Sequence, residues 1–146
     1  MTAVLAVFAV GGLAGCSRST ECGDSGGCTP LYRVTTNSRA DGPVVDVVEG
    51  VLTAARHGDV VCFELRDDAG VMSSLAFPER WHAYQAGDTG YILAGQEVIA
   101  ARSDDRVRVS VSARDRRAVV GSCPAAGVLF THRVSPSDVS VPTTSR

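Results

Sequence analysis

The chain contains no lysine, so all 14 of its basic residues are arginines. Its 16 acidic residues leave a formal net charge of only −2, which is too small to suggest nucleic acid or an anionic surface as a partner, and we expect no nucleic acid. Aromatic residues make up just 5% of the chain, and there is one tryptophan. No apolar run reaches the roughly 20 residues that a membrane-spanning helix needs. The composition is therefore that of one ordinary domain with additional segments at its ends.

The N-terminal residues form an apolar run that ends in a short motif with a cysteine. Ala3–Val10 are all apolar, no charge precedes Arg18, and the run closes with Leu13-Ala14-Gly15-Cys16. A run of this length fits the apolar region of an export signal followed by a small-residue cleavage site. The four residues Leu13 to Cys16 resemble the lipobox of bacterial lipoproteins, and the Arg-only, Ala- and Val-rich composition resembles actinobacterial secreted proteins.

That resemblance implies a lipid anchor and a location. The Cys16 thiol would be alkylated by a diacylglyceryl group, and the signal peptide, residues 1–15, would be removed. Two or three acyl chains would then hold the protein on the extracytoplasmic face of the cell membrane. Met1–Ala3 lack the Lys or Arg with which an export signal opens, a departure that a start codon further upstream would explain.

Four further cysteines, Cys22, Cys28, Cys62 and Cys123, form an even set in a chain expected to be exported. Such a set predicts two disulfides, for which three pairings exist. We favour Cys22–Cys28 with Cys62–Cys123, and the main alternative joins Cys28 to Cys62 and Cys22 to Cys123. The gap between Cys22 and Cys28 is too wide for a common zinc knuckle. We therefore expect no metal and no cofactor.

Period-two alternation and turn residues predict short strands through the second half of the chain. In Arg106–Ala113, three valines alternate with polar residues, as in a half-buried antiparallel strand. The expected strands are 60–65, 71–77, 89–93, 97–102, 106–113 and 128–134, with a short one at 31–35. Glu79–Asp88 reads as a loop, and paired aspartates mark turns at 67–68 and 104–105.

Residues 43–57 are ambiguous. Val44, Val48, Val51 and Ala55 lie at helical spacing, but five valines and Gly50 disfavour a helix. The segment reads equally well as a strand with a bulge at Gly50, which we favour because the following segments are β-like.

These elements predict a mainly β fold, a small antiparallel β-barrel or sandwich of six or seven short strands stapled by a disulfide. The domain is expected over 43–134. The lipidated cysteine and a flexible tether would occupy 16–42, and a disordered tail 135–146. The segment 44–134, with Cys62-Phe63-Glu64-Leu65 and Asp105-Arg106-Val107-Arg108-Val109, is similar to small OB-like barrels in actinobacterial lipoproteins.

Two motifs compete for a functional interpretation. Gly23-Asp24-Ser25-Gly26-Gly27 matches the nucleophile motif of trypsin-like proteases, but no histidine lies upstream and a tether supplies no oxyanion hole. We interpret it as a chance match and expect no catalytic residues. The better candidate is a binding loop with Glu79, Arg80, Trp81, His82 and Tyr84, residue types common at interfaces. The bland alternative is that Trp81 or Tyr84 caps the barrel. His57, His82 and His132 lie in different predicted elements and suggest no shared site.

The sequence therefore predicts a non-enzymatic envelope lipoprotein that binds an envelope protein or a cell-wall component. The alternatives are a small-ligand carrier and, last, a hydrolase.

Overall fold

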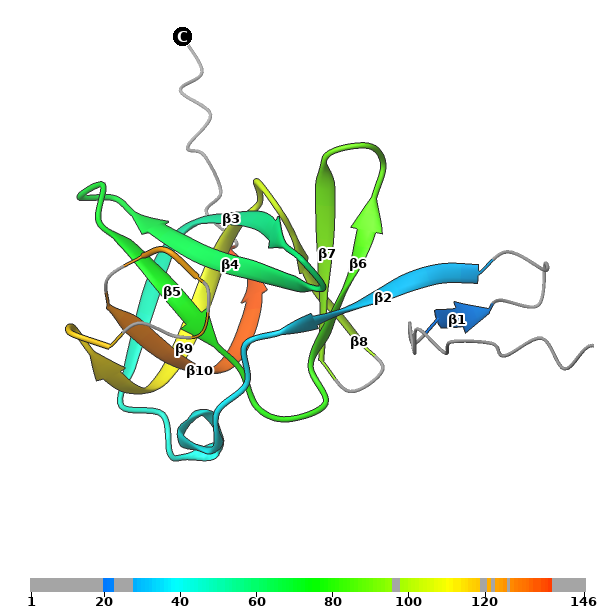
Figure 1. Cartoon of the computed structure of the whole chain (residues 1–146). Helices are drawn as coiled ribbons and strands as arrows, with labels where there is room; N and C mark the ends of the chain where they lie inside the picture. The colour runs from blue at the N-terminus through cyan, green and yellow to red at the C-terminus, as the bar shows by residue number, and fades with distance from the viewer. Residues whose placement is uncertain are drawn as a thin grey trace, which may run out of the picture.

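The computed structural model describes residues 20–22, 28–95, 98–118, 121, 123–125 and 127–137, and the environments of side chains from Pro30 onward. Within these residues, ten strands and one short 3₁₀ helix, η1 (Ser38–Asp41), account for most of the chain (Figure 1). All ten strands join one sheet, part of which closes into a ring. Cys16, the Gly23–Gly27 motif and residues 138–146 lie outside the described residues.

Five strands form the ring. They are β3 (Asp46–His57), β4 (Val60–Asp67), β5 (Met72–Ala76), β9 (Arg106–Asp115) and β10 (Val128–Pro136). Around the ring the order is β3, β4, β5, β10, β9 and back to β3. Every pair is antiparallel except β5 with β10, which run parallel. The predicted barrel is thus present and closed, with one parallel pair that the sequence pattern does not reveal.

The ring closes because β3 pairs on both sides. Its first half pairs with β9 and its second half with β4, and Gly50 and Val51 belong to both ladders. A Cβ on Gly50 would lie 2.3 Å from the carbonyl oxygen of Arg66, so only glycine fits there. The predicted bulge at Gly50 is wrong, since both ladders continue through it without a register shift. The residue instead permits a close backbone approach at the point of closure.

Apolar side chains fill the interior of the ring. Val107, Val109 and Val111 of β9 are fully buried, while Arg108 between them is exposed, which confirms the predicted alternation. Leu52 of β3 and Phe63 of β4 belong to the same buried cluster. A five-stranded ring has a narrow interior, and here the core side chains occupy it.

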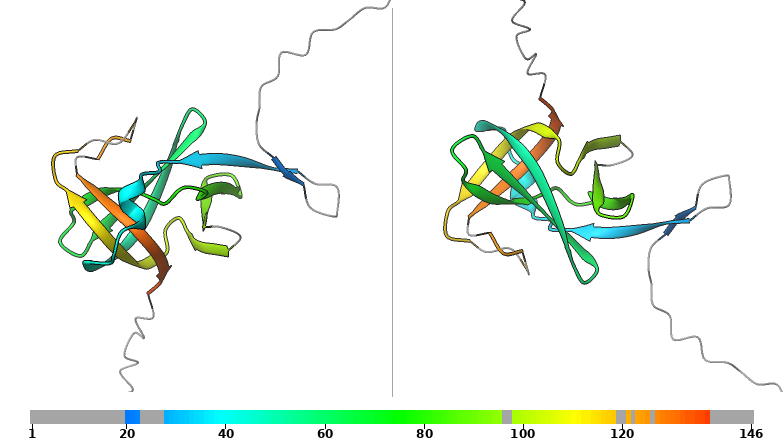
Figure 2. Two further views of the ribbon diagram at one scale, coloured as in Figure 1. Left: turned by 90° about the horizontal axis from the view of Figure 1, so that it is seen from below. Right: turned by 90° about the horizontal axis from the view of Figure 1, so that it is seen from above.

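A second group of strands extends the sheet away from the ring. It contains β1 (Thr20–Cys22), β2 (Cys28–Val34), β6 (His82–Ala86), β7 (Gly90–Gly95) and β8 (Val98–Arg102). β2 joins β4 in parallel through two residue pairs, and β6, β7 and β8 follow as an antiparallel meander. Figure 2 shows the β1–β2 hairpin projecting from the body in both views.

The observed fold belongs to the class expected from the sequence, but the number and bounds of its strands differ from the expectation. The mainly β fold with a barrel is confirmed, and 43–57 contributes a strand and not a helix. Ten strands replace the expected six or seven. β2 begins well before the expected domain boundary at residue 43, because it pairs with both β4 and β6. Similarly, β10 runs to Pro136, past the expected start of the tail.

One disulfide staples the ring. Cys62 on β4 is bonded to Cys123, which precedes β10, with the Cα atoms 5.5 Å apart. Both cysteines are buried. Of the favoured pairings, Cys62–Cys123 is confirmed and the alternative that uses Cys62 with Cys28 is wrong. Cys22 and Cys28 lie directly opposite each other in the β1–β2 ladder, and their side chains are outside the described part.

Candidate functional site

The candidate residues 79–84 occupy a turn and the start of a strand. The Trp81 backbone N–H donates to the Pro78 carbonyl at 3.4 Å, which closes a turn through Glu79 and Arg80. His82 and Tyr84 follow on β6, so the expected loop 79–88 is wrong for these positions. The physical reason is that β6 is held by pairing on both edges. One partner, β2, is distant in the sequence, and the other, β7, follows after a turn.

Trp81 packs against its neighbours. Its ring stacks on Phe77 with centroids 5.1 Å apart and an interplanar angle of 9°. A Cβ on Gly95 would lie 2.6 Å from Trp81 Cε2, so the indole rests directly against the Gly95 backbone. Trp81 is half-buried and belongs to the rim of the main apolar cluster. These contacts favour the packing interpretation of Trp81, with only its remaining surface accessible to a partner.

His82 and Tyr84 form a hydrogen-bonded pair on one face of β6. His82 Nδ1 lies 3.1 Å from the Arg80 carbonyl oxygen, and Nε2 lies 2.8 Å from the Tyr84 hydroxyl. Because a carbonyl only accepts, Nδ1 carries the proton, and in the neutral ring Nε2 accepts from Tyr84. The rings meet edge to face at 4.9 Å. The pair fixes the start of β6 behind the turn that carries Arg80.

A groove that the sequence does not reveal lies between β8 and β10. Trp81 and Pro78 line it, with Val98 and Ile99 on one side and Val134 and Pro136 on the other. Val98 and Ile99 are 70% and 60% exposed, unusually high for such residues on a strand. β8 is also the last strand of the sheet, and no strand in the described residues pairs with its outer edge. The expected strand 97–102 is therefore a free, apolar edge.

The remaining histidines and paired carboxylates do not converge. His57 is exposed at the end of β3, and His132 Nδ1 faces the Ala40 carbonyl oxygen at 3.3 Å. Asp67 Oδ1 accepts from the backbone N–H groups of Ala69 and Val71, which confirms its turn role. The backbone N–H of Arg117 lowers the pKa of Asp115 by donating to its carboxylate, as in another turn.

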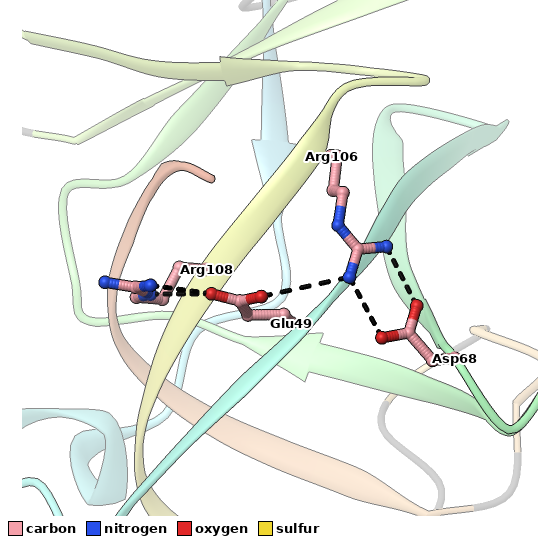
Figure 3. A network of polar contacts seen from close by, with 4 residues as sticks. All are labelled: Glu49, Asp68, Arg106 and Arg108. Carbon is pink, nitrogen blue, oxygen red and sulfur yellow. Dashed lines mark hydrogen bonds and ion pairs between the residues drawn. The ribbon is translucent and has the colours of Figure 1, made fainter. Parts of the chain in front are cut away.

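A surface network joins β3 and β9 to the β4–β5 turn. Glu49 bonds Arg108 at 2.8 Å, and Arg106 holds the Asp68 carboxylate through both of its terminal nitrogens at 2.8 and 2.9 Å (Figure 3). The hydrogen bond from Arg106, aided by its charge, lowers the pKa of Asp68. This carboxylate therefore favours the folded state above its ordinary pKa, and the contribution disappears as the pH falls through the lowered value. Two arginines balance two acids, so the network is structural.

Among the described residues, no group of three His, Cys, Asp or Glu side chains is placed to hold a metal ion. In the same part of the chain, no helix has the length and hydropathy needed to cross a bilayer. Comparison with protein-family models, curated proteins and solved structures finds no match to this chain.

Proposed function

We propose that this chain is an envelope lipoprotein, anchored through lipid on Cys16, whose folded domain is a non-enzymatic interaction module. The strand order of the ring supports the resemblance to small OB-like barrels. Its parallel pair is β5 with β10, which are the third and the fifth ring strands in chain order. The Cys62–Cys123 disulfide is consistent with an oxidising compartment outside the cytoplasm. The partner on this proposal is an envelope protein, and its binding surface is the β8 edge with the adjoining groove.

The observation that carries the interaction role is the unprotected edge of β8. Exposed strand edges pair readily with other chains, and proteins normally protect them with charges, prolines or a covering element. β8 reads Val98-Ile99-Ala100-Ala101 before its first charge at Arg102. Closure of the ring removes the edges of five strands, which leaves β8 as an open one. An extended segment of a partner would add there as a strand.

The packing of the ring argues against the carrier alternative. A carrier would use the barrel interior, yet Leu52, Phe63 and Val109 are at most 1% exposed within it. Small closed barrels have room for side chains or for one small ligand, not for both.

The anchor is tested by replacing its acceptor. A Cys16→Ser chain should lose incorporation of labelled fatty acid and leave the membrane fraction or stay unprocessed. The disulfide-bonded domain should be unaffected, because the bond joins Cys62 to Cys123. Unchanged labelling and membrane association of Cys16→Ser would contradict the lipobox assignment.

The interaction role is tested by photo-crosslinking in the cells that make the protein. A photoreactive residue at Val98 should give one discrete crosslinked product, and the same residue at Val71 should give none. Val71 is the matched control because it is 55% exposed and apolar but lies outside the β8 groove. A charge added by Ile99→Arg should abolish the Val98 product. Equal products at both positions, or no effect of Ile99→Arg, would contradict the proposal.

A further inference from the structure

A second groove runs along β2 and shares Trp81 with the groove beside β8. It has a volume of about 1150 Å³ and extends from Pro30 on β2 to Trp81 and His82. Its ionisable lining contains three arginines, Arg33, Arg56 and Arg80, but one carboxylate, Asp59. The chain as a whole has a net charge of −2, so this groove is locally basic on a mildly acidic protein.

The single carboxylate of the groove is already engaged. Arg33 bonds Asp59 at 2.7 Å, with both side chains more than 70% exposed. Arg56 lies over the Tyr32 ring at 5.3 Å and donates to its hydroxyl at 3.1 Å, without a carboxylate partner among the described residues. The guanidinium of Arg80 has no ion pair or hydrogen bond with any described group. Two positive charges therefore face the groove uncompensated.

The backbone of Arg80 gives an independent reason to look there. Arg80 has φ +74° and is the third residue of the turn closed by Trp81 and Pro78. Turns of this kind favour glycine at that position because other side chains are strained there. The other such residue, Asp104 with φ +72°, is of a type that tolerates this conformation. The strained backbone of Arg80 is not offset by any described contact of its side chain. Such strain is typical of functional positions.

The course of the chain places the groove close to the proposed anchor. Cys16 precedes Thr20, the first residue of β1, by four positions, so their Cα atoms lie at most about 14 Å apart. β2 then leads from the projecting hairpin into the body of the domain (Figure 2), and its residues from Pro30 onward line the groove. A headgroup layer beneath the hairpin would thus lie within reach of the basic groove.

We propose that the β2 groove binds the phosphate groups of anionic membrane lipids through Arg80 and Arg56. This assignment deepens the proposed function and rests on it for the location of the protein beside a membrane. Binding would orient the domain with the β2 groove toward the bilayer. The mild net charge of the chain conceals such a site, because three arginines but one carboxylate line the groove.

The test measures vesicle binding by the full chain carrying Cys16→Ser, so that lipidation does not contribute. Vesicles of phosphatidylcholine alone measure the effect of the apolar N-terminal residues, and vesicles containing phosphatidylglycerol add the anionic headgroups. The fluorescence of Trp81, the only tryptophan and part of the groove lining, reports engagement. We expect preferential binding to the anionic vesicles that weakens with salt.

Arg80→Gly separates function from folding. Since glycine relieves the strained φ, Tm should rise by a few degrees. The preference for anionic vesicles should nevertheless fall about fivefold, and about thirtyfold together with Arg56→Gln. Arg66→Ala is the matched control, because it removes one exposed charge outside the groove. Equal losses for Arg80→Gly and Arg66→Ala would overturn the proposal.

Inorganic phosphate distinguishes the source of the anion. Millimolar phosphate should compete only at the level of its ionic strength, as chloride does. Specific saturation by phosphate with no vesicle preference would overturn the assignment to lipid and indicate a soluble ligand. The result does not depend on lipidation of Cys16, so failure of the anchor and failure of the groove are separate outcomes.

Discussion

Replacing both Cys62 and Cys123 by alanine should lower the free energy of unfolding by about 4 kcal/mol. The crosslink spans 61 residues, and the loss of chain entropy that it imposes on the unfolded state corresponds to that value. In a domain of this size the loss amounts to a fall in Tm on the order of 20 °C. The two sulfurs are buried against the ring, so the double variant also avoids leaving a free thiol in the core.

Thermal unfolding followed by far-ultraviolet circular dichroism measures this effect. The Tm of the untreated protein should exceed that of the double variant, and a reducing agent should lower the Tm of the parent far more than that of the double variant. Thr35→Val is a useful control, since it removes the hydroxyl 3.4 Å from Cys123 Sγ and keeps the crosslink. A double variant as stable as the parent would show that the bond does not constrain the unfolded chain.

Gly50→Val should prevent the barrel from closing. The new Cβ would lie 2.3 Å from the carbonyl oxygen and 2.9 Å from the carbonyl carbon of Arg66, and backbone atoms on a paired strand have little freedom to move. We expect a loss of at least about 3 kcal/mol, at the upper end of the effects of overpacking. Gly50→Ala, with the same Cβ, should show most of this loss.

Gly58→Ala is the matched control for Gly50. Gly58 has φ +64° but nothing within 4 Å of its would-be Cβ, so alanine there adds backbone strain without a clash. It should cost about 1 kcal/mol. Urea denaturation of the three variants measures the difference. Equal effects at positions 50 and 58 would mean that β3 can move away from β4 without loss of closure.

The strands that the sequence predicts correctly are those whose evidence is local. Val107, Val109 and Val111 alternate with polar residues, and Asp67 marks its turn through its own side chain. β6 is missed because its residues read as a loop until its partners β2 and β7 are known. β2 is predicted only in part: its second half agrees with the expected strand 31–35, whereas its start at Cys28 is missed because Pro30 and the Ser- and Gly-rich residues before it suggest a tether.

For the candidate site, too, the sequence reveals local features but not those that depend on the whole fold. The sequence identifies residues 79–84 as a place where Trp, His and Arg gather, and the structure places Trp81 between two grooves. The sequence alone cannot identify Val98 and Ile99 as an exposed surface, because a free strand edge depends on the order of all strands in the sheet. The strain at Arg80 is likewise a property of backbone geometry, not of residue type.

The closure of the ring has a consequence for the time at which the chain can fold. Ser74 pairs with Val128, and Asp46 pairs with Val111, so the ring depends on partners far apart in the sequence. Loop-closure entropy makes such topologies slow to form. The barrel cannot close before β10, the last strand, has emerged. A nascent chain that stays open until its C-terminal region is complete is compatible with the export that we propose, in which the polypeptide would cross the membrane unfolded and Cys62 would be oxidised afterwards.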